Sequence, residues 1–268
     1  MLRALRTKGG AALVGLGLAF SSPSFAADLP GYRGSLDPGP PVHHYTVGSC
    51  YVRADVGYSR AVVPNVRWPV FNGAFVGEHV ADVEIDDSWL GDIGVGCGAG
   101  SRGMRAELAL GLRGAQDLDG TPLAVGANPI DPLHTTVSSY TMMFNVYRDL
   151  GYWGKTVPYV GLGIGVAFNE LDDVSFSRIP PVNNTIRGDD ELSFAWSLMA
   201  GFAHQISSRA VVDFGYRYID LGSVRSGRID TALNQQSAVR VDDLAAHEFK
   251  IGLRYYLGAV APGPGALK

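Results

Sequence analysis

The chain has 268 residues, of which 46% are hydrophobic and only 18% are charged, and this charged fraction is below the usual quarter of a soluble protein. The net charge of −4 becomes −7 when Arg3, Arg6 and Lys8 are removed with the first segment of the chain. Such acidity disfavours nucleic acid as a partner, because the phosphate backbone would repel the protein.

Residues 1–26 have the three parts of a secretory signal peptide. The basic residues come first, an apolar run from Gly9 to Phe20 follows, and Ser24-Phe25-Ala26 forms a small-x-small cleavage site. The apolar run is shorter than the roughly 20 residues that a membrane-spanning helix needs, and no later segment reaches that length. We therefore expect an exported protein. If it is a membrane protein, it must span the membrane with strands.

The next segment, residues 27–48, is rich in proline and glycine and has no hydrophobic period. This composition predicts a flexible periplasmic segment. We expect the folded part to cover residues 49–258 and a C-terminal tail to cover residues 259–268.

From Cys50 onward, large apolar residues alternate with small or polar ones in eight segments. Alternation predicts strands, because successive side chains of a strand point to opposite faces. In chain order the predicted strands are 51–59, 89–97, 104–112, 140–147, 159–169, 193–203, 210–218 and 247–258. Long connections (about 60–87, 114–135, 169–191 and 220–245) alternate with short ones (about 98–103, 149–157 and 205–209). This succession predicts an up-and-down meander with two different ends, as in outer-membrane barrels.

The two faces of the predicted strands differ in side-chain size. In the fifth strand, Leu162 and Ile164 alternate with Gly161, Gly163 and Gly165. A water-soluble barrel of the lipocalin type would expose the glycine face, whereas soluble strands usually expose Lys, Glu or Thr. Small residues suit a narrow lumen, and uncharged apolar residues suit lipid, where a charge costs roughly 2–4 kcal/mol. Because lipid cannot satisfy an open strand edge, the first and last strands must pair. We predict an all-β protein, an eight-stranded antiparallel up-and-down transmembrane β-barrel.

The inward face of this barrel carries charges of both signs in equal number. They are Arg53, Asp55, Asp92, Arg105, Glu107, Asp213, Arg217, Glu248, Lys250 and Arg254. A selectivity filter would show a surplus of one sign, and a lone buried charge is costly. We therefore expect an ion-pair network in a plugged lumen, with a proton or ion path as the alternative.

Three segments carry a resemblance to a known family: "YVRADVGYS" in the first strand, "NVYRDLGYW" in the fourth and "HEFKIGLRYYLG" in the last. Over about residues 50–258 the chain resembles the small eight-stranded outer-membrane barrels, which include opacity-type surface proteins, the OmpA transmembrane domain and surface antigens of alphaproteobacteria. The resemblance implies export to the outer membrane of a Gram-negative bacterium, with its lipid and lipopolysaccharide as surroundings. Lys250, Gly252, Tyr255 and Leu257 resemble the signal that the barrel assembly machinery reads in the last strand.

Catalytic motifs are absent from the sequence, which contains no GxSxG, HExxH, Walker loop or CxxC. A lipid-modifying barrel would need a His beside a Ser or an acid on the lipid-facing surface. His204 and His247 share the outward face but lie near opposite ends of the barrel, so they do not form such a site. We expect no enzyme activity and no cofactor.

The long connections carry pairs of aspartates, which are weak candidates for calcium or magnesium ligands and otherwise form a solvated acidic rim. The pairs are Asp86-Asp87, Asp172-Asp173, Asp189-Asp190 and Asp242-Asp243. His79 and His134 lie on the same connections, and the resemblance to haem-binding surface proteins makes them candidate haem contacts. We expect a structural or surface-interaction role with an unidentified loop partner; the alternative is a small pore or a ligand-uptake protein.

The two cysteines, Cys50 and Cys97, lie at the start of the first strand and the end of the second. Both have outward parity, and opposed residues of paired strands lie about 4.5–5.5 Å apart, within the range of a disulfide. Export to an oxidising compartment favours that bond. A register slip of two residues would instead leave two free thiols on the lipid side.

Overall fold

The computed structural model describes residues 50–68, 80–98, 103–122, 132–151, 153–176, 185–227, 229–231, 234–236 and 238–257. The expected signal peptide at 1–26, the segment at 27–48 and the tail at 259–268 lie outside the described residues. In the ranges that are described, no helix has the length and apolar character needed to cross a membrane.

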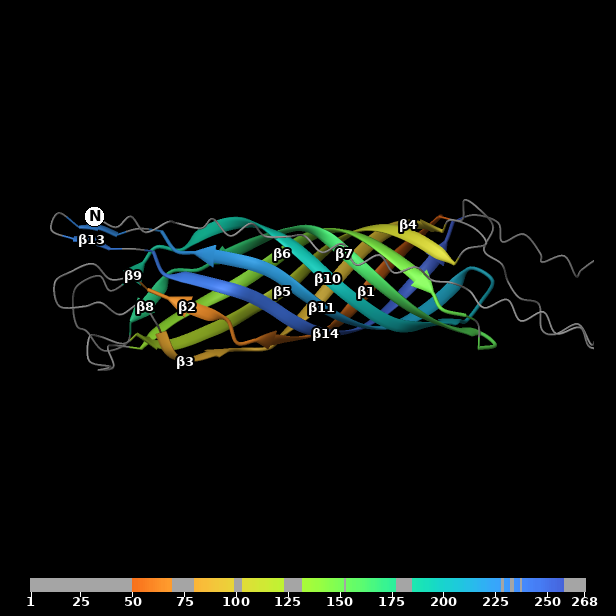
Figure 1. Ribbon diagram of the computed structural model, residues 1–268, viewed down its shortest axis with the longest axis horizontal. Helices are drawn as coiled ribbons and strands as arrows, with labels where there is room; N and C mark the ends of the chain where they lie inside the picture. Colours follow the sequence, from red (N-terminus) through yellow and green to blue (C-terminus); the bar gives the residue numbers. More distant parts are fainter. Residues whose placement is uncertain are drawn as a thin grey trace, which may run out of the picture. The chain divides into compact units, whose positions relative to one another are not determined.

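Eight long strands form the wall of a closed barrel (Figure 1). They are β1 (Cys50–Val62), β4 (Ser88–Gly98), β5 (Met104–Pro122), β6 (Leu133–Asp149), β7 (Thr156–Leu171), β10 (Asp189–Gln205), β11 (Ala210–Arg225) and β14 (Arg240–Tyr256). Each long strand pairs antiparallel with the next one along the chain. The ring closes where β1 pairs with β14, from Tyr51 opposite Tyr256 to Val62 opposite Ala245. The predicted eight-stranded up-and-down barrel is confirmed.

Short strands occupy the described parts of the long connections. They are β2 (Asn65–Arg67), β3 (Val80–Ile85), β8 (Val174–Phe176), β9 (Thr185–Ile186), β12 (Ile229–Thr231) and β13 (Asn234–Gln236). Figure 1 shows β2, β3, β8, β9 and β13 at one end of the barrel, which we call the long-loop end. The opposite end, where β4 leads to β5, β6 to β7 and β10 to β11, is the short-turn end.

The long strands continue further into the long connections than the alternation predicted, and β5 shows why. A bulge between Arg113 and Gln116 reverses which residues face inward. Beyond it Leu118 is fully buried, whereas Asp117 and Asp119 are exposed. The pattern changes from apolar-outside to apolar-inside because the surroundings of the wall change from lipid to water. The predicted loop at 114–135 was therefore wrong in its first and last residues.

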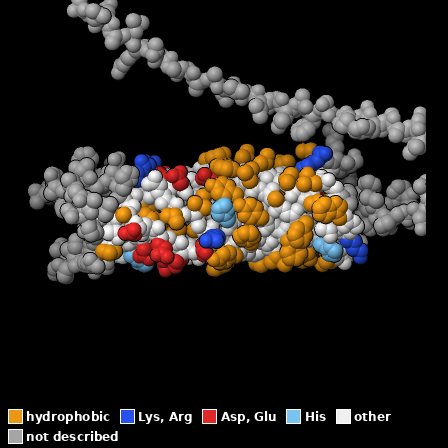
Figure 2. Space-filling view, turned by 60° about the horizontal axis from the view of Figure 1, so that its bottom comes forward, with side chains coloured by type: hydrophobic (Ala, Val, Ile, Leu, Met, Phe, Trp, Pro, Cys, Tyr) orange, Lys and Arg blue, Asp and Glu red, His pale blue; other side chains and the backbone are white. Residues whose placement is uncertain are grey.

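Between the bulge and the short turns, the outer wall carries a belt of large apolar side chains. Val56, Trp89, Ile93, Leu162, Phe194 and Phe249 are each more than half exposed. Figure 2 shows hydrophobic side chains gathered over this part of the wall, while Asp and Glu gather toward the long-loop end. A water-soluble monomer rarely exposes an apolar surface of this extent, whereas a lipid-embedded barrel requires it.

The interior of the barrel has three layers of side chains. An aromatic layer at the short-turn end contains Tyr51, Tyr147, Val157, Tyr159, Met199, Ala203, Val211 and Tyr256. An ionic layer containing the predicted inward charges follows. An apolar layer toward the long-loop end includes Leu118, Leu133, Met143, Leu171, Ile219, Leu221, Val241 and Leu244, together with Val66, Val80, Val174 and Ile186 from the short strands. Burying each large aliphatic side chain stabilises the fold by about 1.5–3 kcal/mol.

Candidate functional site

The ionic layer is built around Glu248, which is fully buried on β14. Its carboxylate accepts hydrogen bonds from Arg113 Nε at 2.7 Å and from Arg217 Nε. The second arm of Arg217 lies 3.0 Å from Asp92 Oδ2, so Arg217 joins two carboxylates that belong to different strands. Side chains alternate between the two faces of each strand, and in β5, β11, β14 and β4 this places all four of these side chains on the inward face. They are buried there, away from solvent.

Lys250 continues the chain of ion pairs across the barrel. Its Nζ donates to Asp92 Oδ2 at 2.8 Å and to Asp55 Oδ2 at 3.1 Å. Asp55 also accepts from Arg53 Nε at 2.8 Å. Because every carboxylate in this series has a cation on each side, no lone charge of the kind that strongly destabilises an interior is left in it.

Glu107 connects the ionic layer to the aromatic layer. Its Oε2 lies 3.7 Å from Arg53 Nη1 and accepts a hydrogen bond from Tyr51 Oη at 3.1 Å, and its Oε1 accepts one from Tyr147 Oη at 3.1 Å. The tyrosines thus satisfy lone pairs that Arg53 does not reach, which a buried carboxylate requires.

Two further ion pairs lie nearer the short-turn end and stand apart from this chain. Arg254 pairs with Asp213, donates to Tyr256 Oη at 3.1 Å and lies 5.0 Å from the ring centroid of Tyr51. Arg105 pairs with Asp149 at the end of β6. The guanidinium of Arg105 lies 4.5 and 4.7 Å from the ring centroids of Tyr147 and Tyr159, a cation–π arrangement with both rings.

Sequence reasoning missed Arg113, Asp149 and the role of the tyrosines in this layer. Arg113 continues the inward parity of Arg105, and Asp149 continues that of Tyr147, so extending each strand by one step would have found both. They add one charge of each sign, and the lumen stays balanced.

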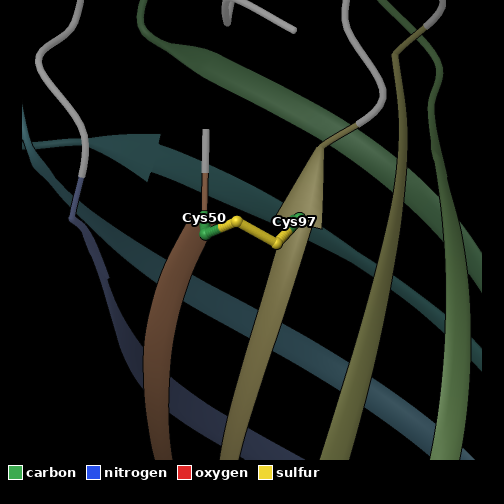
Figure 3. Close-up of a disulfide and its surroundings, with 2 residues drawn as sticks. All are labelled: Cys50 and Cys97. Atoms are coloured by element: carbon green, nitrogen blue, oxygen red, sulfur yellow. A yellow bond between two sulfur atoms is a disulfide. The ribbon is translucent and has the colours of Figure 1, made fainter. Parts of the chain in front are cut away.

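The structure joins Cys50 and Cys97 in a disulfide at the short-turn end (Figure 3). The two residues are opposite each other in the register of β1 and β4, with a Cα–Cα distance of 4.0 Å. The described part of the chain contains no free cysteine. The bond ties the start of the first strand to the end of the second.

The residues of the expected assembly signal occupy both faces of the last strand. Lys250 belongs to the ionic layer, and a Cβ at Gly252 would collide with the carboxylate of Asp55. Tyr255 and Leu257 are exposed on the outer wall, and Leu257 N donates to Cys50 O at 2.8 Å. The close approach of Asp55 is by itself a sufficient structural reason for a glycine at position 252.

The aspartate pairs at the long-loop end are not gathered into one metal-binding cluster within the described ranges. Asp87 accepts from Tyr58 Oη and from Ala61 N, and Asp242 pairs with Arg67 and Arg240. Asp172, Asp173, Asp189 and Asp190 line one open depression of about 950 Å³ beside Arg187 and His134.

Of the two candidate haem contacts, the structure describes His134. His134 Nδ1 lies 2.6 Å from Asp119 Oδ1 on the exposed outer surface of β6. The hydrogen bond to Asp119 raises the pKa of His134 above its usual value, which stabilises the protonated ring rather than the neutral ring that a metal ligand must be. His79 lies outside the described residues.

The two outward histidines considered for lipid chemistry also lie apart. His204 Nδ1 is 3.0 Å from Thr156 Oγ1 at the short-turn end, and His247 Nδ1 is 2.7 Å from Tyr216 Oη further along the wall. Neither ring has a carboxylate partner among the described residues.

A family model and several known proteins are similar to this chain. Residues 12–256 match the family described as outer membrane protein beta-barrel domain. An uncharacterized protein of Brucella melitensis is 31% identical over 199 residues, which are 67% of this chain and 70% of that protein. The outer membrane protein PagN of Salmonella typhimurium is 27% identical over 157 residues, which are 57% of this chain and 64% of that protein. The crystal structure of OprG from Pseudomonas aeruginosa is similar with a TM-score of 0.47 at 13% identity, over 81% of this chain and 99% of that one.

The family match covers nearly the whole folded part of the chain, and the Brucella protein shares about a third of its aligned residues. Both findings confirm the resemblance seen in the strand sequences. The chain therefore belongs to the outer membrane protein beta-barrel domain family, and it lies in the outer membrane of a Gram-negative bacterium.

Proposed function

We propose that this protein is a non-catalytic barrel with a closed lumen, whose long-loop end interacts with partners outside the cell. The observation that supports the proposal is the succession of buried aromatic, ionic and apolar layers along the inside of the barrel. Contact with lipopolysaccharide around the wall and recognition of the last strand by the barrel assembly machinery are parts of the same proposal.

The ionic layer supports closure because its charges neutralise one another. Arg217, Glu248 and Arg254 are each at most 1% exposed. An ion that entered this layer would have to displace side chains already paired at hydrogen-bond distance, and no surplus of one sign attracts it. The apolar layer beyond it surrounds the path with buried aliphatic side chains, and its buried Ser139 and Asn169 already hydrogen-bond each other.

The long-loop end supports a role in surface interaction because its described part is built from paired strands and is strongly acidic. The strands carry backbone hydrogen bonds well beyond the apolar belt, so the outer surface is an extension of the wall. Among the described residues of this end, exposed acids outnumber exposed bases. The acids are Asp82, Glu84, Asp86, Asp87, Asp117, Asp119, Asp172, Asp173, Asp189, Asp190 and Asp243, and the bases are Arg60, Arg187, Arg225 and Arg240. Electrostatic complementarity favours a basic partner.

Conductance in planar lipid bilayers tests the closed lumen. We expect the refolded protein to insert without stepwise ion conductance, whereas a conducting outer-membrane porin in the same bilayer serves as the positive control. Steady single-channel steps that scale with the amount of inserted protein would establish the alternative, a small pore or uptake protein.

A binding screen in lipid nanodiscs tests the surface role. Basic proteins should bind more tightly than acidic ones of similar size, and the binding should weaken as salt rises because exposed charges are screened. Asp172→Asn with Asp189→Asn should reduce binding, while Arg148→Gln at the opposite end should not. Equal binding of acidic and basic proteins would contradict the proposal.

A further inference from the structure

The short-turn end presents a patch of cations and large apolar side chains, which we call the rim patch (Leu150, Trp153, Lys155, Ile206 and Arg209). The β6–β7 and β10–β11 turns form it together, since Gln205 N donates to Lys155 O at 2.9 Å. The side chains of Lys155 and Arg209 are exposed. Trp153, Leu150 and Ile206 are 75%, 60% and 57% exposed beside them.

The turns that carry this patch are held in place by hydrogen bonds. Trp153 and Thr156 exchange two backbone hydrogen bonds at 2.8 and 3.1 Å, and Ser207 Oγ accepts from Ala210 N at 3.0 Å. Thr156 Oγ1 also lies 3.0 Å from His204 Nδ1, which ties the two turns together. The patch is therefore presented in a fixed arrangement and needs little ordering to bind a ligand.

The cations of this rim lack acidic partners among the described residues. Neither Lys155 nor Arg209 is within ion-pair distance of a described carboxylate, and neither is Arg148, which points outward at the end of β6. The neighbouring acid, Asp149, is turned into the lumen and occupied by Arg105. Figure 2 shows basic side chains beside hydrophobic ones at this end, and no acidic side chain there on the displayed face.

The charge of the described surface is thus polarised along the barrel axis, with an acidic long-loop end and a basic short-turn end. Short turns of outer-membrane barrels face the periplasm, so the rim patch lies at the level of the inner-leaflet headgroups. Tryptophan favours that level, and basic side chains reach from the apolar wall to phosphate groups there.

We propose that the rim patch binds the headgroups of anionic phospholipids in the inner leaflet of the outer membrane. Lys155 and Arg209 contact the phosphate groups, Arg148 supplies a third cation on the neighbouring wall, and Trp153, Leu150 and Ile206 enter the acyl region beside them. The apolar belt continues into the patch, which favours lipid over a polar cell-wall polymer as its occupant. The inference depends on the orientation of the barrel and not on the closed lumen or on an outer partner.

Native mass spectrometry of protein released from nanodiscs tests this inference. The full chain is refolded in nanodiscs that contain phosphatidylcholine and phosphatidylglycerol, and the ratio of the two lipids retained on the barrel is measured. We expect the wild type to retain phosphatidylglycerol preferentially. The double variant Lys155→Gln/Arg209→Gln should lose that preference by about fivefold for each cation removed.

Arg225→Gln/Arg240→Gln is the matched control, because it removes two exposed cations from the long-loop end, where each is paired with an acid. The control should retain the wild-type lipid ratio, and a heat-modifiable gel shift verifies that all variants are folded. Excess glycerol phosphate should not displace the lipid, since the apolar contacts bind only an acyl chain.

Three results would overturn the inference. One is a wild-type lipid ratio equal to that of the nanodisc, and another is an equal loss of preference in the control. The third is binding of soluble peptidoglycan fragments that the Lys155→Gln/Arg209→Gln variant loses while its lipid ratio is unchanged, which would assign the patch to the cell wall.

Discussion

The buried charges of the lumen differ in how many partners they have, and this determines what each substitution does. Lys250 and Arg217 each bridge two carboxylates. Asp213 has one cation, Arg254, among the described residues, and its second oxygen accepts no hydrogen bond there. The pair Arg254–Asp213 is therefore the simplest place to measure the cost of an uncompensated charge.

We expect Arg254→Met to lower the free energy of unfolding by about 3–5 kcal/mol, because it leaves the Asp213 carboxylate buried without a counter-charge. Adding Asp213→Asn should recover part of that loss, so the double variant is less destabilised than the two single changes added together. Urea unfolding in liposomes, followed by tryptophan fluorescence, measures all four proteins. Arg225→Met, at an exposed pair, is the control and should change stability by at most about 1 kcal/mol. Strict additivity of the two lumen substitutions would contradict a direct coupling.

His134 offers a second test at the residue scale, outside the membrane. The hydrogen bond and the charge of Asp119 raise its pKa, so the pair stabilises the fold below the unfolded-state pKa of about 6.5 and loses this effect as pH rises through the higher folded-state pKa. An NMR titration of the ring protons should give a midpoint above about 6.5, and Asp119→Asn should lower it. Glu191→Gln, a distant acid on the same end, should leave the midpoint in place. An unchanged midpoint in Asp119→Asn would show that the contact does not persist in solution.

At the scale of the elements, the sequence predicted the ring of strands because one rule holds along the whole lipid belt. Most outward residues there are large and uncharged, and most inward ones are small, polar or charged, so strand identity and facing could both be predicted. The rule ends at the edge of the lipid. Past Arg113 the bulge shifts the alternation by one residue, so that Leu118 points inward and Asp117 outward. The sequence prediction assumed apolar residues on the outer face, and it therefore assigned these residues to a loop.

The ion-pair partners could not be predicted for a different physical reason. Alternation fixes the face of a residue but not its height relative to the neighbouring strands, which depends on the stagger of the ring. Glu248 bonds Arg113 of β5, a strand that is not adjacent to β14 in the ring. Only closure of the barrel brings such side chains together across the lumen.

The disulfide links the paired strands β1 and β4. Cys50 and Cys97 are 47 residues apart in sequence, and closing a loop of that length in the unfolded chain stabilises the fold by about 4 kcal/mol in the chain-entropy model. We expect Cys50→Ser/Cys97→Ser to insert as a barrel but to unfold at a lower urea concentration, with a loss of about 2–4 kcal/mol. Reduction of the wild type should shift its unfolding to match that variant.

The redox state of the native protein is checked independently. Non-reduced protein from membranes is alkylated and examined by mass spectrometry, and the bonded state predicts no alkylated cysteine. Two alkylated thiols would contradict the disulfide, and unfolding curves that coincide for wild type and variant would contradict its stabilising effect.

At the scale of the whole molecule, the interior of the barrel is charged in the lipid-embedded part and apolar toward the long-loop end. The change follows from the surroundings of the wall, which are lipid in the first part and water in the second. Within lipid the charges must point inward and be paired, which creates the ionic layer. Within water the charges point outward, and the freed interior becomes the apolar layer. The closed lumen that we propose thus has two chemically independent layers, in addition to the aromatic side chains at the short-turn end.

This independence gives a test of the closed lumen. Asp92→Ser/Lys250→Ser removes one cation and one anion from the ionic layer while Asp55 keeps Arg53 and Arg217 keeps Glu248. Leu118→Ser/Leu133→Ser opens the apolar layer, where both side chains are fully buried.

Each double variant should remain without conductance in planar bilayers, because the other layer still blocks the path. We expect conductance only when the aromatic layer is opened as well, by adding Tyr147→Ser/Tyr159→Ser to the quadruple variant, since water can then follow polar groups through all three layers. A gel shift verifies that each variant is folded. Conductance in the ionic-layer variant alone would show that neither the apolar nor the aromatic layer seals the barrel and that the ion pairs are its single barrier.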